Sequence, residues 1–585
     1  MSVDASVLEP RRSRRILRRA REFLRELPGT GKRFWVLVVL TGAAAGLGAV
    51  FLVQTLRLFE DAAWPPGTSF LASIRKAPLW YRFTVPALGG VIVTLAGLAA
   101  RRPMGGHGTA GIIESIWFRS GRLPFGWSFY RGVVSIVAVA LGAPLGREGA
   151  LLQFGAATGS ALGQRLKISA DQMRLLVACG AAAGMAAAYN VPIGASVFGL
   201  EVLLGSFAIE SFGPIVVACV VGTLISRILI ANHPSYVIPH HALLRARELG
   251  IDLAVGPILG VACALYNKTL NGFVVAFDRV PKKVMPVMPI AAMALVGVTA
   301  IWLPELLGNG YDAVNLSLLG KLPWTLLLIL PGAKMIVTAL TSAAGVPGGL
   351  FTPSLYFGAL LGGALGHLIH LVAPSAAPAG AYALIGMGAV LAGTTHAPVS
   401  AVLIIFELTG SYEVILPLML TSVLAAAVSR KLEPRSLYSA PLSRRNLGMP
   451  STPVSPFAKV RSALDIMTPG VEQISARAPF QEVVARMIEL PPGHDLYVTT
   501  PEGRLAGTIF LDAMKGQLPD HGLLDAAVAS DVMDTRIVPL GDTASLSEIA
   551  SRFAETYLER LPVTDARGHV LGTVSKRDVL RYAKF

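Results

Sequence analysis

Two glycine-rich segments of this chain repeat one another at a constant spacing, and the first contains a glutamate in an otherwise apolar run. Pro144 recurs as Pro347 and Gly163 recurs as Gly366, which gives the same offset of 203 residues at both ends. Glu148 lies in the first segment, within the tetrapeptide Gly-Arg-Glu-Gly. A carboxylate at membrane depth is costly, and by default it marks an ion pathway, a proton relay or a gate.

A second pair of matching segments lies farther along the chain. The tripeptide at 190–192, followed by Glu201, recurs at 396–398, followed by Glu407, with an offset of 206 residues. Repeats made of glycine- and proline-interrupted apolar segments are typical of transport proteins with an ion site at the bilayer midplane. The sequence therefore predicts an internally duplicated membrane protein.

The composition favours a membrane protein over a soluble one. Of the 585 residues 53% are hydrophobic, and the mean hydropathy is +0.59. Many apolar runs approach or reach about 20 residues, the length that crosses a bilayer. The clearest runs are 34–56, 85–100, 214–230, 290–303, 326–340 and 414–428. The runs 181–204 and 350–371 are interrupted by glycines, and we expect them to be helices that stop partway through the membrane.

The first 33 residues are strongly basic. Eight arginines lie between Arg11 and Arg25, and the formal net charge of the chain is +15. By the positive-inside rule this end is cytoplasmic, which predicts a multi-pass protein of the plasma or inner membrane. An apolar stripe at helical spacing makes the segment either a helix on the anionic leaflet or only a topology-setting tail. Because the charge adjoins a membrane span, nucleic-acid binding is not expected.

Composition divides the chain into five regions. They are the basic segment 1–33, the membrane domain 34–440, a proline-punctuated linker 441–459, and two copies of a soluble α/β unit at 460–517 and 525–585. The soluble copies are identified by a second repeat, in which Asp465–Met467 recurs as Asp531–Met533. The three cysteines lie in apolar runs without metal or redox spacing, so no metal site is expected.

Several motifs resemble, in order and spacing, the CLC family of chloride channels and transporters. They are Gly105–Gly108, Gly146–Gly149, Asn190–Pro192, Gly349–Pro353, Phe406–Gly410 and Tyr438. The C-terminal repeat is similar to a tandem pair of CBS domains, which many family members carry after the membrane part. The resemblance covers nearly all of residues 34–585.

The resemblance implies a homodimer in the bilayer, with one anion path in each subunit and two inverted repeats whose half-helices meet at the midplane. Glu148 matches the gating glutamate, which occupies an anion position until protonation or a competing anion releases it. The expected anion-path residues are His107, Gly108, Gly146, Arg147, Gly349, Leu350, Phe351 and Tyr438. Helix N-termini suit this role, because their free N–H groups and partial positive charge bind an anion without holding it too tightly.

Three of these residues have a second interpretation. Glu148 would be structural if it formed a buried salt bridge with Arg147. Independently, Tyr438 could be an interfacial aromatic anchor. His107 stands where chloride-selective members usually have serine. Since an imidazole titrates near neutrality, we expect it to influence anion preference, unless it is a packing histidine that points away from the path.

Val202 stands where proton-coupled exchangers often have an inner glutamate. A valine cannot relay a proton, so the leading prediction is a chloride-selective channel with a glutamate gate, dependent on pH or voltage and modulated by the CBS pair. The first alternative is a proton-coupled anion antiporter. A CBS-bearing magnesium channel is a remote alternative, because the clustered oxygen ligands that such cations need are sparse in the spans. No residue set typical of an enzyme is present in the membrane region.

The second CBS copy resembles an adenosine-binding pattern at Thr573, Ser575 and Asp578, where a hydroxyl and an aspartate contact ribose or phosphate. ATP or AMP is therefore a candidate ligand, although transport itself requires no cofactor. The first copy departs from the pattern, because Asp512 lies one residue closer to its glycine than Asp578 does. The alternative is a purely structural dimerisation module.

Overall fold

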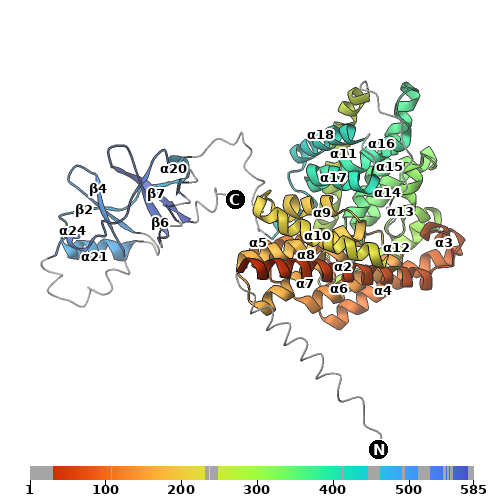
Figure 1. Ribbon diagram of the computed structural model, residues 1–585, viewed down its shortest axis with the longest axis horizontal. Helices are drawn as coiled ribbons and strands as arrows, with labels where there is room; N and C mark the ends of the chain where they lie inside the picture. The colour runs from red at the N-terminus through yellow and green to blue at the C-terminus, as the bar shows by residue number, and fades with distance from the viewer. Residues whose placement is uncertain are drawn as a thin grey trace, which may run out of the picture. The chain divides into compact units, whose positions relative to one another are not determined.

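The computed structural model describes residues 30–106, 108–230, 236, 248–410, 414–445, 462–490, 495–510, 527–544, 548–549, 552–553, 556 and 558–576. The chain forms two compact units, Met1–Met449 and Pro450–Phe585 (Figure 1). The division falls within the predicted linker 441–459, and the finer domain boundaries stay predictions. Residues 1–29 of the basic N-terminal segment, His107 and Asp578 lie outside the described residues.

The first half of unit 1 is helical. Its elements are α2 (Thr30–Ala63), α3 (Phe70–Lys76), α4 (Leu79–Ala100), α5 (Gly108–Phe118), α6 (Phe125–Ala140), α7 (Glu148–Leu166), α8 (Ala170–Tyr189), α9 (Pro192–Phe198), the π-helix η2 (Gly199–Leu204) and α10 (Ile209–Leu229). The predicted interruption of the run 181–204 is confirmed. α8 ends before Asn190, which adopts a left-handed backbone, and Pro192 begins α9 because proline suits the first helical position.

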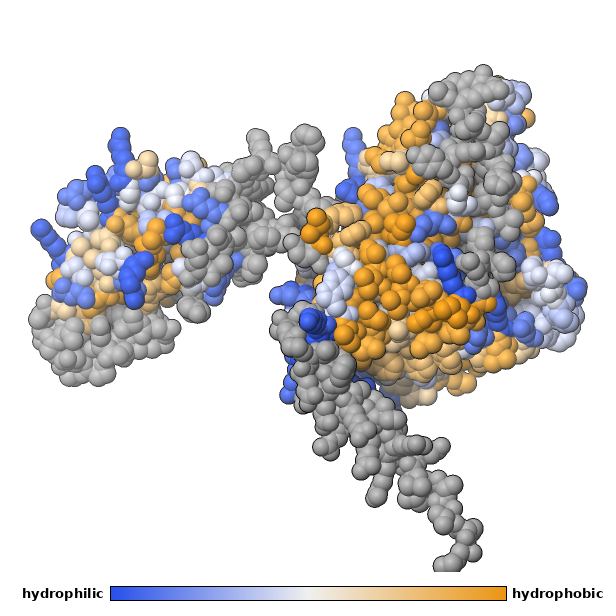
Figure 2. All heavy atoms as spheres, viewed as in Figure 1, coloured by the Kyte–Doolittle hydropathy of each residue, from blue (hydrophilic) through white to orange (hydrophobic). Residues whose placement is uncertain are grey.

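The second half is helical as well. Its elements are α11 (Glu248–Phe277), η3 (Met285–Val287), α12 (Met288–Trp302), η4 (Pro304–Leu306), α13 (Tyr311–Leu318), α14 (Trp324–Ala343), α15 (Phe351–Val372), α16 (Ala379–Thr395), α17 (Pro398–Thr409), α18 (Ile415–Leu432) and α19 (Ala440–Ser443). Within the described residues, eight helices are long and apolar enough to cross a membrane. Large apolar side chains face outward on this unit, among them Leu58, Trp302 and Leu371. Hydrophobic residues, in orange, cover much of the face of this unit that Figure 2 shows.

The expectation that glycines interrupt the run 350–371 is wrong, because α15 continues without a break from Phe351 to Val372. Its glycines serve helix packing instead. Three glycines of α15 face α16, as three glycines of α7 face α8: Gly358, Gly362 and Gly366 in one pair, and Gly155, Gly159 and Gly163 in the other. A side chain at any of these six positions would overlap the neighbouring helix. The segments related by the 203-residue offset therefore form equivalent, closely packed helix pairs, α7 with α8 and α15 with α16.

Unit 2 contains the same small fold twice. In the first copy β2 (Gln473–Ser475) is parallel to β3 (Leu496–Thr499), which is antiparallel to β4 (Leu505–Ile509). In the second copy β5 (Leu540–Gly541), β6 (Arg560–Thr564) and β7 (Val570–Ser575) are arranged identically. The strand β1 (Thr468–Pro469) pairs with β7 across the copies. The short helices are α20 (Ala463–Ile466), α21 (Phe480–Glu489) and α24 (Ala529–Val532). The two copies thus support the repeat seen in the sequence.

Candidate functional site

Three helix starts come together at the centre of unit 1. Gly108 begins α5, Glu148 begins α7 and Phe351 begins α15. Two hydrogen bonds join the repeats: the Gly146 amide donates to the Gly349 carbonyl at 2.9 Å, and the Gly349 amide donates to the Gly146 carbonyl at 2.7 Å. The repeats thus bring the two predicted anion-path segments side by side, and the Gly349 amide is already engaged in this bridge.

The Glu148 carboxylate sits on the N-terminus of α15. Its Oε1 accepts a hydrogen bond from the Thr352 amide at 3.0 Å, and its Oε2 accepts one from the Thr352 hydroxyl at 2.9 Å. The Tyr189 hydroxyl lies 3.3 Å from Oε2. The side chain is only 3% exposed. Because a helix N-terminus favours negative charge, the carboxylate takes the position that an anion would take there.

Glycines on both sides leave room for this carboxylate. A methyl group on Gly146 would overlap both carboxylate oxygens of Glu148. A methyl group on Gly349 would overlap Oε1 and also the Gly149 amide nitrogen. A methyl group on Gly108 would overlap the Gly149 carbonyl oxygen, so the start of α5 packs closely against the start of α7. The amides of Leu350 and Phe351 have no partner within their helix, and they stay the candidate anion donors of α15.

Arg147 does not hold Glu148 in a salt bridge in this structure. Its guanidinium donates to the Ala188 carbonyl at 3.3 Å and lies over the Tyr311 ring, 5.4 Å from the ring centre. It also lines a pocket of about 640 Å³ together with Glu60 and Asp312. The Arg147 guanidinium therefore faces a polar pocket, while the Glu148 carboxylate faces α15.

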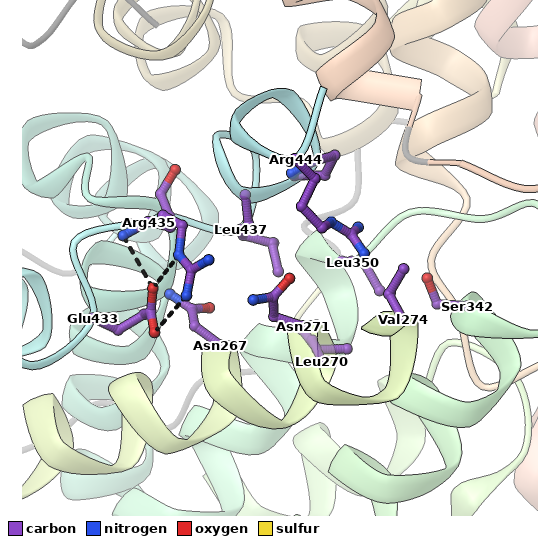
Figure 3. A pocket seen from close by; sticks show the side chains of 13 residues that line it. Asn267, Leu270, Asn271, Val274, Ser342, Leu350, Glu433, Arg435, Leu437 and Arg444 are labelled. Carbon is purple, nitrogen blue, oxygen red and sulfur yellow. Dashed lines mark hydrogen bonds and ion pairs between the residues drawn. The ribbon is translucent and has the colours of Figure 1, made fainter. Parts of the chain in front are cut away.

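Tyr438 is buried at 4% exposure and packs edge-on against Phe198. Its hydroxyl is within hydrogen-bonding reach of the Thr109 side chain, at the start of α5. A small pocket lies beside this region (Figure 3), and its walls include Leu350, Leu437 and the side-chain amides of Asn267 and Asn271. The predicted donor Leu350 thus borders this pocket.

The loop that precedes His107 is held by a partly buried cation that sequence reasoning missed. The Arg131 guanidinium, on α6, donates to the carbonyl oxygens of Met104 and Gly106 and to Gln153 Oε1. His107 itself is outside the described residues. Arg131 belongs to none of the repeats or motifs that the sequence analysis used. Its charge could have identified it, because a charged side chain within an apolar membrane helix is costly and often marks a functional position.

Val202 is 7% exposed and lies in the π-helix η2. Its neighbour Glu201 accepts hydrogen bonds from the amides of Val399 and Ser400 at 3.3 and 2.7 Å and from the Ser400 hydroxyl at 2.6 Å. The repeat mate Glu407 accepts from the amides of Ile193 and Gly194 at 3.0 and 2.6 Å. Each glutamate thus caps the short helix of the other repeat.

In unit 2, Thr573 and Ser575 lie on β7, with Thr573 buried and Ser575 partly exposed. Asp578, the third residue of the predicted nucleotide pattern, is outside the described residues, as is Asp512 of the first copy. No group of three or more histidine, cysteine, aspartate or glutamate side chains in the described part of the chain is placed to hold a metal ion.

Duplicated membrane helices with a carboxylate seated on a facing helix start define a multi-pass anion transport protein. Residues 86–430 match the family described as voltage gated chloride channel, and residues 529–584 match the CBS domain family. The chain belongs to the voltage gated chloride channel family, and it carries a C-terminal CBS domain.

Curated relatives agree with this family. A chloride channel protein described as ClcB-like, from Ralstonia nicotianae, is 35% identical over 414 residues, which is 69% of this chain and 95% of the relative. The voltage-gated ClC-type chloride channel ClcB of Escherichia coli O81 is 32% identical over 403 residues, 67% of this chain and 92% of the relative.

Solved structures share the fold. A slow cyanobacterial Cl⁻/H⁺ antiporter matches with a TM-score of 0.64 at 22% identity, covering 70% of this chain and 97% of its own. A eukaryotic CLC transporter matches with a TM-score of 0.61 at 19% identity, covering 93% of this chain and 97% of its own. At these identities the matches show the fold.

Proposed function

We propose that the membrane unit is a chloride-selective channel and that Glu148 is its gate. The observation that carries the proposal is the Glu148 carboxylate on the N-terminus of α15, buried and held by the Thr352 amide at 3.0 Å. A carboxylate in that position excludes an anion from the same N–H groups. Its release, by protonation, by voltage or by a competing anion, opens the path between the two repeats.

Replacing Glu148 with glutamine tests the gate. The neutral amide competes poorly for an electropositive site, so Glu148→Gln should raise chloride efflux from reconstituted vesicles about tenfold or more at neutral pH. Glu407→Gln is the matched control, because it neutralises a carboxylate on a different helix start. Unchanged efflux and unchanged pH dependence in the Glu148 variant would refute the gate.

The absence of an acid at Val202 supports passive conduction. The nearest acid in sequence, Glu201, is occupied as a helix cap, and Glu114 is held by Arg119 and Arg445 at 2.6 and 2.8 Å. A proton-coupled antiporter is the second candidate, because the solved relatives include proteins described as Cl⁻/H⁺ and fluoride/proton antiporters. Reversal potentials in opposed chloride and proton gradients separate the two. Sustained uphill proton movement that is lost with Glu148→Gln would establish the antiporter.

His107 is proposed to tune anion preference. The loop that precedes it is held by Arg131, which donates to the carbonyl oxygens of Met104 and Gly106. His107→Ser removes a titratable donor, and it should change the ratio of chloride to fluoride or nitrate flux, or the pH dependence of anion affinity. Identical ratios and pH profiles in both proteins would place His107 outside the path.

The CBS region is proposed to regulate the channel from the cytoplasm, as part of a homodimer with a cytoplasmic N-terminus in the inner membrane. Truncation after Ser443 should leave a dimeric core that conducts, because the repeats that build the proposed ion path end near Tyr438. Thr573, Ser575 and Asp578 are the proposed nucleotide contacts. Calorimetry with ATP and AMP on residues 450–585, with Asp578→Ala for comparison, tests this. No heat with either nucleotide would leave the region as a structural dimer clamp.

A further inference from the structure

We propose that Tyr189 and Thr352 form a hydroxyl latch, which holds the Glu148 carboxylate on the anion position and sets how readily an anion displaces it. The inference rests on the proposed gate and deepens it. Neither hydroxyl belongs to the residues expected at the anion path, and both come from helices that flank the site, α8 and α15. They are positioning residues, which act on the anion through Glu148.

The three side chains form one closed cluster. Thr352 Oγ1 lies 2.9 Å from Glu148 Oε2 and 2.7 Å from the Tyr189 hydroxyl, and Tyr189 completes the triangle at 3.3 Å from Oε2. Exposure is 3% for Glu148, 1% for Tyr189 and zero for Thr352. The Tyr189 ring is itself fixed by Phe351, at 5.4 Å between ring centres. Water therefore has little access to compete for these bonds, which strengthens them.

The direction of the hydrogen bonds follows from counting protons. An ionised carboxylate only accepts, and each hydroxyl donates once. The distances then select one assignment, in which Thr352 donates to Glu148 Oε2 at 2.9 Å and Tyr189 donates to Thr352 at 2.7 Å, rather than to Oε2 at the longer 3.3 Å. The result is a chain in which the Tyr189 hydroxyl polarises the Thr352 hydroxyl, which in turn binds the carboxylate. Thr352 is thus the direct contact and Tyr189 strengthens it from behind.

This arrangement makes the hydroxyls specific for the seated carboxylate. The Thr352 amide would serve an incoming anion as well as it serves Glu148, because it belongs to the helix start itself. The hydroxyl pair is aimed at Oε2, the oxygen that the amide does not bind. We therefore expect the pair to favour Glu148 over a competing chloride and to lower the apparent chloride affinity of the closed protein.

Thr352→Val and Tyr189→Phe test the latch in the full-length protein. Each removes a hydroxyl and nearly preserves shape. Chloride affinity is measured by calorimetry in detergent and chloride efflux by reconstitution, both at one fixed pH. Loss of a hydrogen bond to a charged group corresponds to about tenfold or more, so Thr352→Val should raise affinity and efflux by that order, with a smaller, severalfold rise for Tyr189→Phe. Thr352→Ser keeps the hydroxyl and should behave as the parent.

Two controls separate the latch from a general disturbance. Tyr356→Phe removes the hydroxyl of another buried tyrosine, which donates to the Glu305 carbonyl, and it should leave both measurements unchanged. In the Glu148→Gln background the latch variants should have no further effect, because the carboxylate that they hold is absent. Equal effects in both backgrounds would overturn the proposal.

The remaining outcomes are also decisive. If Thr352→Val lowers chloride affinity, its hydroxyl binds the anion directly and the latch is wrong. If Glu148→Gln changes flux but both latch variants stay within twofold of the parent, the gate stands and the latch fails. If Glu148→Gln itself changes nothing, the proposed gate fails first. Should Thr352→Val not fold, Tyr189→Phe and its double variant with Glu148→Gln still decide the question.

Discussion

The two repeats of the membrane unit share a backbone plan and differ in the chemistry at their helix starts. At the 203-residue offset Gly146 corresponds to Gly349, and both take part in the bridge that joins the repeats. Two positions farther on, Glu148 of the first repeat corresponds to Phe351 of the second. One repeat therefore provides the carboxylate, and the other provides the helix start that receives it.

At the second pair of matching segments, with the offset of 206 residues, the two repeats keep the same chemistry. Glu201 and Glu407 are repeat mates, both are glutamates, and each caps the short helix of the other repeat. Val202 and its mate Leu408 are both apolar. The comparison separates two kinds of residue. Where the repeats agree, the residues build the inverted scaffold, and where they differ, the residues supply the proposed gate and its partners.

The largest effect is expected from Gly146→Ala, which fills the space of the gate without touching its charge. The new methyl group would meet the Glu148 carboxylate, the free end of a side chain, and Gly146 does not adopt a positive φ. Displacing the carboxylate should raise chloride efflux about tenfold or more, as loss of its hydrogen bonds implies.

The repeat mate supplies the comparison for this variant. A methyl group on Gly349 also meets the Gly149 backbone, so Gly349→Ala should reduce stability as well as disturb the gate. Efflux assays and thermal unfolding of both variants measure the difference. A folded Gly146→Ala protein with parental efflux would show that the carboxylate does not block the path.

A smaller effect, on stability, is expected from the symmetric pair. Glu201→Gln and Glu407→Gln should each destabilise the protein by about 1–3 kcal/mol, since each weakens charge-assisted bonds to a helix start. Glu201 accepts three hydrogen bonds and Glu407 two, so Glu201→Gln should cost more. Thermal unfolding in detergent measures this. A change in anion selectivity from either variant would break the division between scaffold and gate.

Much of this architecture was accessible from the sequence. The constant offsets predicted the duplication, and the expected interruption of the run 181–204 is found at Asn190, just before Pro192 begins α9. The glycines of α15 were misread, because a glycine in an apolar run interrupts a helix or packs it closely, and only the position of α16 distinguishes the two.

The site was harder to predict than the fold. Glu148 was conspicuous because its charge is costly in a membrane. Tyr189 and Thr352 gave no such signal, since a tyrosine or threonine in an apolar helix is inexpensive and common. Their role depends on contacts between residues 163 positions apart in the chain, which no local pattern encodes. The same holds for Arg131, whose acceptors are backbone carbonyls.

The smallest effect is expected in the C-terminal unit, on the pH dependence of its stability. Its two copies also differ at equivalent positions. Asp495 precedes β3 and Arg560 begins β6, so the 65-residue offset pairs an acid with a base. Burial raises the pKa of the Asp495 carboxyl to about 6, although the nearby charge of Arg560 opposes this. The folded unit therefore binds this proton more tightly than the unfolded chain, whose carboxyl titrates near its usual value of about 4.

The sign of the pH dependence follows from that difference. The contribution of Asp495 to stability is complete below pH ~4 and is lost as the pH rises to about 6, after which it is constant. Asp495→Asn should remove this slope and raise stability at neutral pH by about 1–2 kcal/mol, after an allowance for solvent screening. Asp534 is the opposite control: the Arg536 guanidinium lowers the pKa of its carboxyl to about 2, so Asp534→Asn should lower stability at neutral pH. Urea unfolding of residues 450–585 between pH 4 and 8 decides the matter, because a parental slope in Asp495→Asn would assign the titration to another group.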